Sequence, residues 1–215
     1  KYDLCLAEKR VYYGLGGGAV FILDLKTEAL RRSTKRDVMD AARLGDGLPK
    51  VDFVMSLVCS LDVPHPVLGL HNLDAMLRNT EKPIIIMDYG TDVYPLLEMA
   101  EAVVGEGNLQ KRPILCMYSE PISPLKHGEK YLKHVITFAK FKLPIVYIPS
   151  PMFGATAPTT LAGGIAQANA ETLSGNAIIQ LVSENSPFIY GADPSIMDMK
   201  TGVFSYGSPE WMLSN

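Results

Sequence analysis

Short apolar runs alternate with longer amphipathic stretches along the chain from Val51 onward. The apolar runs contain few polar residues, which is typical of strands buried on both faces in a parallel sheet covered by helices. The predicted strands are residues 53–59, 84–87, 114–118, 145–148 and 188–190. The intervening periodicity predicts helices at 70–79, 94–104, 129–141 and roughly 158–183.

This alternation predicts an α/β fold. Five successive strand–helix units fit either a (β/α)8 TIM-type barrel or an open, doubly wound sheet, and we expect the barrel. A complete barrel typically needs about 250 residues. The chain has 215 residues, starts without Met and stops within a helical pattern, which suggests a fragment of a longer protein. We therefore expect residues 51–215 to form the first five or so units of an incomplete barrel.

Residues 1–50 follow a different pattern and are predicted to form a lead-in of a β-hairpin and a short helix. The β-type runs 11–13 and 19–23 flank a glycine-rich segment, which predicts a hairpin with the glycines at its turn. Residues 14–19 also match the G-x-G-x-x-A dinucleotide fingerprint, but a strand-like run follows where that motif requires a helix. Thr34 and Asp37 form a capping box that predicts a short helix ending at Gly45.

Composition excludes several classes of function. The hydrophobic content of 47% with 20% charged residues is ordinary for a globular protein. A formal net charge of -3 gives no indication of nucleic-acid binding, and no apolar run is long enough to predict a membrane span. Three cysteines without motif spacing predict a reducing, cytoplasmic environment. The four histidines form no recognised metal-binding pattern with them, so no bound metal is expected.

Acidic and aromatic residues occur where several predicted strands end. In parallel α/β folds the ligand site lies at these carboxyl ends. For any single carboxylate, a helix cap or a hydrogen bond within a loop is the favoured interpretation. As a set, carboxylates beside aromatic rings suit a cation, particularly an alkylated ammonium. The predicted substrate-binding residues are Asp88, Tyr89, Tyr118, Glu120, Ser150, Met152, Tyr190 and Asp193.

The segment from Gly154 to Glu171 joins a loop to a helix rich in small residues, and its motifs resemble the trimethylamine methyltransferase family. The resemblance continues downstream through residues 198–202 and 207–210 and covers nearly all of the chain. The motif residues are Gly154, Thr156, Ala157, Pro158, Gln167, Asn169, Glu171 and Gly191.

The resemblance implies a (β/α)8 barrel enzyme that moves a methyl group from a methylated amine to the Co(I) of cobalamin on a separate corrinoid protein. The amine would be trimethylamine or a quaternary amine such as glycine betaine. This chain would bind no cofactor directly, and catalysis would rest on positioning and electrostatics. Family members that act on trimethylamine carry pyrrolysine late in the barrel. The deciding position would lie beyond Asn215, so catalytic residues stay unassigned and the fragment alone is expected to be inactive.

The expected partners are the corrinoid protein and the small amine, with no nucleic acid or membrane, and homo-oligomerisation is left open. Two other functions compete with methyl transfer. A barrel lyase or aldolase acting on a small carbonyl compound usually needs a Schiff-base lysine or metal ligands, and no lysine falls at a predicted strand end. A non-catalytic fragment that binds a methylated amine is the second alternative.

Overall fold

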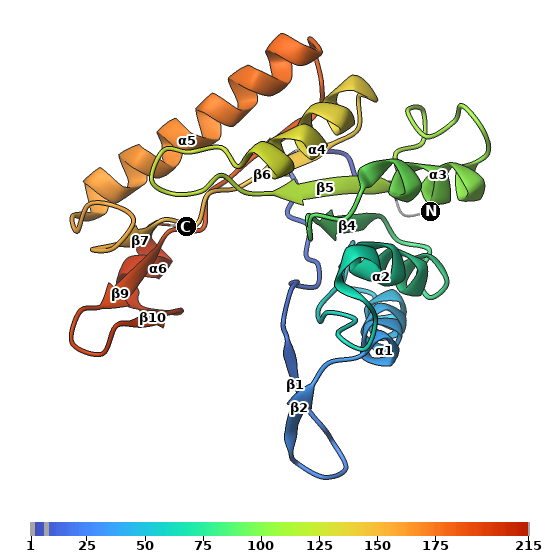
Figure 1. Cartoon of the computed structure of the whole chain (residues 1–215), viewed down its shortest axis with the longest axis horizontal. Helices are drawn as coiled ribbons and strands as arrows, with labels where there is room; N and C mark the ends of the chain where they lie inside the picture. The colour runs from blue at the N-terminus through green and yellow to red at the C-terminus, as the bar shows by residue number, and fades with distance from the viewer. Residues whose placement is uncertain (1–2, 7–8, 215) are drawn as a thin grey trace. The chain divides into compact units, whose positions relative to one another are not determined.

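The structure, a computed structural model, describes residues 3–6 and 9–214. The predicted segments 1–50 and 51–215 begin at Lys1 and end at Asn215, and these two terminal residues lie outside the described residues. The chain divides into two compact units, Lys1–Met117 and Tyr118–Asn215, shown in blue to green and in yellow-green to red in Figure 1. Each unit has its own elements and its own buried residues.

Unit 1 contains a projecting hairpin, parallel strands and helices. Strand β3 pairs in parallel with β4, and the N–H of Ile84 donates to the carbonyl of Ile114 just before β5. Helices α1 and α2 pack side by side (Figure 1). The elements are β1 (Phe21–Leu23), β2 (Leu30–Arg32), α1 (Lys35–Gly47), β3 (Val54–Met55), the 3-10 helix η1 (His65–Val67), α2 (Leu68–Leu77), β4 (Ile84–Met87), α3 (Val93–Val104) and the start of β5 (Leu115–Ser119).

The predicted N-terminal hairpin is present, but its strands are β1 and β2, paired antiparallel. The predicted pairing of 19–23 with 11–13 is therefore wrong. Gly14 and Ala19 instead form parallel bridges with Phe53 and Val58, so the glycine-rich segment runs alongside β3. A Cβ at Gly14 would collide with the ring of Phe53, which shows that glycine here permits close approach to the sheet.

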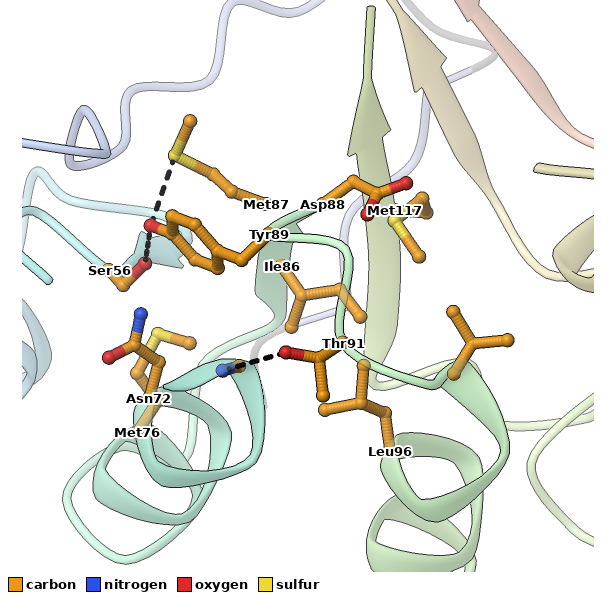
Figure 2. A pocket seen from close by; sticks show the side chains of 12 residues that line it. Ser56, Asn72, Met76, Ile86, Met87, Asp88, Tyr89, Thr91, Leu96 and Met117 are labelled. Carbon is orange, nitrogen blue, oxygen red and sulfur yellow. Dashed lines mark hydrogen bonds between the residues drawn. The ribbon is translucent and has the colours of Figure 1, made fainter. Parts of the chain in front are cut away.

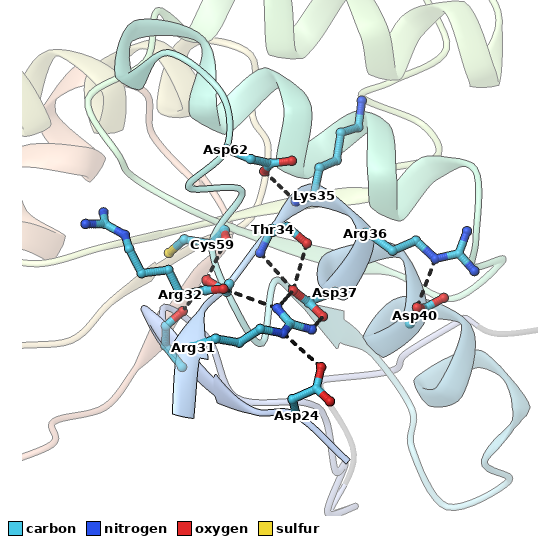
Figure 3. A network of polar contacts seen from close by, with 12 residues as sticks. Asp24, Arg31, Arg32, Thr34, Lys35, Arg36, Asp37, Asp40, Cys59 and Asp62 are labelled. Atoms are coloured by element: carbon cyan, nitrogen blue, oxygen red, sulfur yellow. Dashed lines mark hydrogen bonds and ion pairs between the residues drawn. The ribbon is translucent and has the colours of Figure 1, made fainter. Parts of the chain in front are cut away.

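An ion-pair network joins the hairpin to helix α1 (Figure 3). The predicted capping box is confirmed, since the backbone N–H and the hydroxyl of Thr34 both donate to Asp37 at 2.8 Å. Arg31 on β2 donates to both carboxylate oxygens of Asp37 at 2.8 Å and to Asp24 at 3.0 Å. These contacts with Arg31 hold the pKa of Asp37 well below its usual range and lower that of Asp24 to about 2.

Helix α1 continues to Gly47 rather than ending at the predicted Gly45. Gly45 is buried within the helix, and a Cβ there would lie 2.9 Å from a methyl group of Leu15. This glycine provides close packing inside the helix, which sequence alone does not distinguish from a stop signal.

Unit 2 contains the end of β5 and two groups of strands. Strand β6 pairs in parallel with β8, and the N–H of Ile148 donates to the carbonyl of Ser119 at the end of β5. A second sheet has the order β10-β9-β7, in which β9 runs antiparallel to β10 and parallel to β7. The elements are α4 (Glu129–Lys140), β6 (Ile145–Tyr147), β7 (Met152–Phe153), α5 (Leu161–Val182), β8 (Phe188–Tyr190), β9 (Ser195–Asp198), β10 (Val203–Ser205) and α6 (Pro209–Ser214).

Strand β5 crosses the boundary between the units, and the larger sheet has the strand order β3-β4-β5-β6-β8. All five predicted strands and all four predicted helices from residue 51 onward are present, with bounds shifted by a few residues. The α/β class is therefore confirmed. Closure into a (β/α)8 barrel needs more strands than these five, so the barrel stays a prediction, as does the division at residue 50.

Helix α5 is packed through its glycines. Gly175 lies under the ring of Tyr147 and Gly164 under the ring of Phe153, and a Cβ at either position would collide with that ring. Helices α4 and α5 lie side by side in unit 2 (Figure 1). The glycines that weaken the helix intrinsically are thus offset by close aromatic packing. No helix in the described part of the chain is long and apolar enough to cross a membrane.

Replacement of Asp37 by Ala should lower the free energy of unfolding by about 1–2 kcal/mol, because it removes the capping box and the partner of Arg31. Asp40→Ala, on the same helix, removes only exposed pairs with Arg36 and Arg43 and should cost less than about 0.5 kcal/mol. Urea denaturation measures both. Since the folded pKa of Asp37 is depressed, its stabilisation is present above the unfolded pKa and is lost on acidification. If Asp37→Ala lost the same unfolding free energy at acidic pH as at neutral pH, the ionised Asp37 carboxylate would not be the source of the stabilisation.

Gly175→Ala should lower the free energy of unfolding by about 1–3 kcal/mol, since the new methyl group must displace the buried ring of Tyr147. Gly47→Ala is the matched control, because nothing lies within 4 Å of a Cβ at that position. The control should be neutral or slightly stabilising. Equal losses in the two variants, measured by thermal or urea unfolding, would show that close packing on α5 is not the cause.

Candidate functional site

The predicted substrate-binding residues fall in two separate units. Asp88 and Tyr89 follow β4 in unit 1, whereas the other six residues lie in unit 2. The structure brings four of those six together. They are Tyr118 and Glu120, which are hydrogen-bonded to each other, Asp193, whose backbone is bonded to Pro149, and Ser150, the next residue after Pro149.

In unit 1, Tyr89 closes a small pocket beside the end of β4 (Figure 2). Its hydroxyl shares a hydrogen bond of 3.0 Å with Ser56 and donates to the sulfur of Met87 at 3.5 Å, and burial raises its pKa well above the usual range. Asp88 accepts from the N–H of Gly90 at 2.8 Å, which orders its own loop. The cavity of about 10 Å³ has room for roughly one water molecule and is too small for a methylated amine. A substrate role for Asp88 and Tyr89 stays a prediction.

In unit 2, Tyr118 and Glu120 form the centre of an acidic cluster. Tyr118 is on β5 and Glu120 follows the strand, so the two side chains leave the same face at a spacing of two residues. The phenol of Tyr118 donates to Glu120 Oε1 at 2.7 Å. Burial, followed by the charge of Glu120, raises the pKa of Tyr118 far above its usual range, so the phenol remains a donor. Ser150, after β6, lies beside this phenol and opposes part of the shift.

Asp193 brings a second carboxylate to this cluster from the segment between β8 and β9. Its backbone N–H donates to the carbonyl of Pro149 at 2.9 Å, and its carboxylate accepts from the indole N–H of Trp211 at 2.9 Å. Partial desolvation, together with the charge of Asp193, raises the pKa of Glu120 above its ordinary value, although Glu120 as a whole is exposed to solvent. Among the described residues neither carboxylate forms an ion pair.

Three aromatic residues near the C-terminal end complete the arrangement, and sequence reasoning did not select them as site residues. The rings of Phe204 and Tyr206 meet edge to face with their centroids 4.2 Å apart. The rings of Tyr206 and Trp211 also meet edge to face, with centroids 6.2 Å apart. Burial, followed by the charges of Asp193 and Glu120, raises the pKa of Tyr206. The alternating aromatics of the Phe204–Tyr206 segment and the chain's single Trp were the available signals.

The other two predicted residues of unit 2 make different contacts. The N–H of Met152 donates to the hydroxyl of Thr156 at 2.8 Å. The phenol of Tyr190 donates to Asn169 on α5 at 2.8 Å. Neither contact involves the two carboxylates, and a substrate role for Met152 and Tyr190 stays a prediction.

The motif residues mostly hold the backbone around α5. Gly154 has a left-handed φ of 86°, which favours glycine, and its N–H donates to the carbonyl of Ala157 at 3.0 Å. Pro158 lies against Gly163 in the first turn of α5, where a Cβ would be 2.9 Å away. The carbonyl of Gly191 accepts from the hydroxyl of Thr172 at 2.9 Å.

Two motif residues, Gln167 and Glu171, face loops that precede the helix. Gln167 donates to the carbonyl of Thr156 at 2.8 Å and to Glu171 at 2.9 Å. Within the described residues, no group of three or more His, Cys, Asp or Glu side chains is arranged to hold a metal ion.

The family model for trimethylamine methyltransferase (MTTB) matches residues 1–215. The chain belongs to the trimethylamine methyltransferase family. It is 34% identical to the trimethylamine methyltransferase MttB of Desulfitobacterium hafniense over 100% of this chain and 44% of that relative.

Two further relatives show the same pattern. The glycine betaine methyltransferase of another Desulfitobacterium hafniense strain is 28% identical over 92% of this chain and 42% of its own length. The trimethylamine methyltransferase MttB of Methanosarcina barkeri is 30% identical over 83% of this chain and 37% of its own length. The chain thus spans less than half the length of these curated relatives.

Glu120→Gln should raise the melting temperature at neutral pH, because Gln keeps an acceptor for Tyr118 and removes a carboxylate whose ionisation is disfavoured by burial. A carboxyl group with a raised folded pKa destabilises the folded state above the unfolded pKa and has no such effect below it. The gain should therefore vanish on acidification. Thermal unfolding over a pH series measures it, and a variant less stable than wild type at neutral pH would contradict the expectation.

Proposed function

We propose that unit 2 binds the cationic, methylated nitrogen of a small amine. The protein would then transfer a methyl group from that amine to the Co(I) of cobalamin carried by a partner corrinoid protein. The observation that carries the proposal is the grouping of two carboxylates with two aromatic rings: Asp193 accepts from Trp211, the ring of Tyr206 meets that of Trp211, and the charges of Asp193 and Glu120 both act on Tyr206. The family relationship supports the reaction class.

A methylated ammonium suits this cluster on electrostatic grounds. The two carboxylates raise the pKa of neighbouring groups and have no cation among the described residues to compensate them. A cation between them would relieve that repulsion. Alkyl groups on nitrogen leave few or no N–H donors, and aromatic faces attract such a cation without hydrogen bonds. Protein and substrate are therefore complementary in charge and in the kind of surface.

The chemical step would consist of methyl transfer with no protein nucleophile. The carbon–nitrogen bond breaks and its electron pair stays on nitrogen, which leaves as the neutral, demethylated amine. Two electrons from Co(I) form the new cobalt–carbon bond, so cobalt is formally oxidised to Co(III). The contribution of Glu120 and Asp193 would be to hold the ammonium with one methyl group directed at the acceptor. Cobalamin enters as the second substrate, presented by the partner.

The binding step is tested with tetramethylammonium and with tert-butanol, an uncharged molecule of similar bulk, by calorimetry. Tetramethylammonium should bind and tert-butanol should not. Glu120→Gln and Asp193→Asn should each weaken binding about tenfold, which corresponds to roughly 1.4 kcal/mol. Glu129→Gln on α4, which removes a carboxylate that is 85% exposed, should leave affinity unchanged. Equal losses in all three variants would attribute binding to overall charge and contradict the site.

The transfer step is tested by incubating the protein with reduced cobalamin and either trimethylamine or glycine betaine. Formation of methylcobalamin is followed by absorbance, with free amine omitted as the control. Methylation with either amine supports the proposed reaction and identifies the preferred substrate. Binding of the ammonium without methylation by any amine would support the non-catalytic alternative instead.

A further inference from the structure

The buried carboxylate of Glu171 has no role in the cation site described above, yet it organises the chain around that site. Glu171 is 2% exposed and lies on α5. It accepts hydrogen bonds from the hydroxyl of Ser123 at 2.6 Å, the N–H of Leu125 at 2.8 Å and the amide of Gln167 at 2.9 Å. None of the ion pairs among the described residues includes it. A buried carboxylate is costly, and here only neutral donors satisfy it.

Two of those donors belong to the loop that follows Glu120. Within this loop, Ile122 and Lys126 exchange backbone hydrogen bonds of 2.7 and 3.1 Å and close a tight turn. Leu125 inside the turn has a φ of 56°, a left-handed conformation that is unfavourable for a residue with a side chain. The carboxylate of Glu171 accepts a hydrogen bond from the N–H of this strained residue. The contact therefore holds the turn in a conformation that the sequence alone disfavours.

A second contact fixes the same loop one turn further along α5. His127 shares hydrogen bonds with the phenol of Tyr147 at 2.7 Å and with the hydroxyl of Ser174 at 3.0 Å. Burial, followed by the charge of Glu171, raises the pKa of Tyr147 well above its usual range, so this phenol remains protonated. The loop is thus attached to the helix at two points, at residues 123–125 and at 127.

We propose that Glu171 is a positioning residue, which fixes the 121–127 loop on α5 and thereby holds Glu120 against Tyr118 and Asp193. Gln167 extends the same function to the segment after β7, because it bridges Glu171 and the carbonyl of Thr156. This assigns a physical role to the Gln167 and Glu171 motif. As far as the ligand is concerned, the inference rests on the proposed function of unit 2.

The first test needs no ligand and follows the titration of the Glu120 carboxyl group by carbon NMR. The groups that face it are Tyr118, Asp193 and Tyr206. In Glu171→Ala, the released loop admits water, so the pKa of Glu120 should fall toward its ordinary value. Glu171→Gln retains an acceptor for Leu125 and should preserve the wild-type titration. Ser123→Ala removes one donor and should give a smaller shift in the same direction, which keeps the test valid if Glu171→Ala fails to fold.

The control variant is Gln180→Ala near the other end of α5. Gln180 holds the turn that follows α5. Its side-chain amide donates to the carbonyl of Ser186 at 3.0 Å and accepts from the N–H of Asn185 at 2.9 Å. Its loss should lower the melting temperature without moving the Glu120 titration. A Glu171→Ala or Ser123→Ala protein that is less stable but titrates like wild type at Glu120 would overturn the proposal.

The second test measures tetramethylammonium affinity in the same variants. Glu171→Ala should weaken binding about tenfold, Glu171→Gln should largely restore it, and Gln180→Ala should leave it unchanged. Failure of the wild-type protein to bind tetramethylammonium would contradict the proposed function alone, because the NMR titration still decides the role of Glu171. Unchanged affinity in Glu171→Ala, with wild-type binding intact, would overturn the positioning role.

Discussion

The hydrogen bond between the Tyr118 phenol and the Glu120 carboxylate is the interaction on which the chemistry of unit 2 depends. It fixes the carboxylate of Glu120 beside the end of strand β5, where partial desolvation disfavours ionisation although the residue is still exposed to solvent. Asp193 then adds a second negative charge from another strand end. Such a pair is electrostatically unfavourable without a cation nearby, which agrees with the ammonium site proposed above.

Helix α5 makes this arrangement possible through its small residues. Gly164 and Gly175 let the helix approach buried rings, and the short distance brings Glu171 within reach of the loop after β5. A larger residue at either glycine would separate the helix from the strands. The helix that first identifies the family therefore has a mainly architectural role. Its carboxylate acts on the site through the backbone of the neighbouring loop.

Unit 1 illustrates a different constraint. The bidentate contact of Arg31 with Asp37 joins the hairpin to the capping box of α1, so a local helix-start signal also serves as a tertiary anchor. The capping box was predictable because its partners are three residues apart. The contact with Arg31 was not, because it depends on where β2 emerges from the hairpin. The same limitation explains the wrong strand pairing predicted for residues 11–13, since glycine permits both turns and close approach.

The sequence by itself determined the alternation of strands and helices from residue 51, the family, and four residues that the structure gathers in one cluster. It could do so because apolar runs, period-two spacing and strand ends are local properties of the chain. Only the tertiary structure decided that Tyr206 and Trp211 join that cluster and that Asp88 and Tyr89 belong to another unit. Such groupings depend on how distant segments pack, and side-chain burial and the pKa of a carboxyl group follow from that packing.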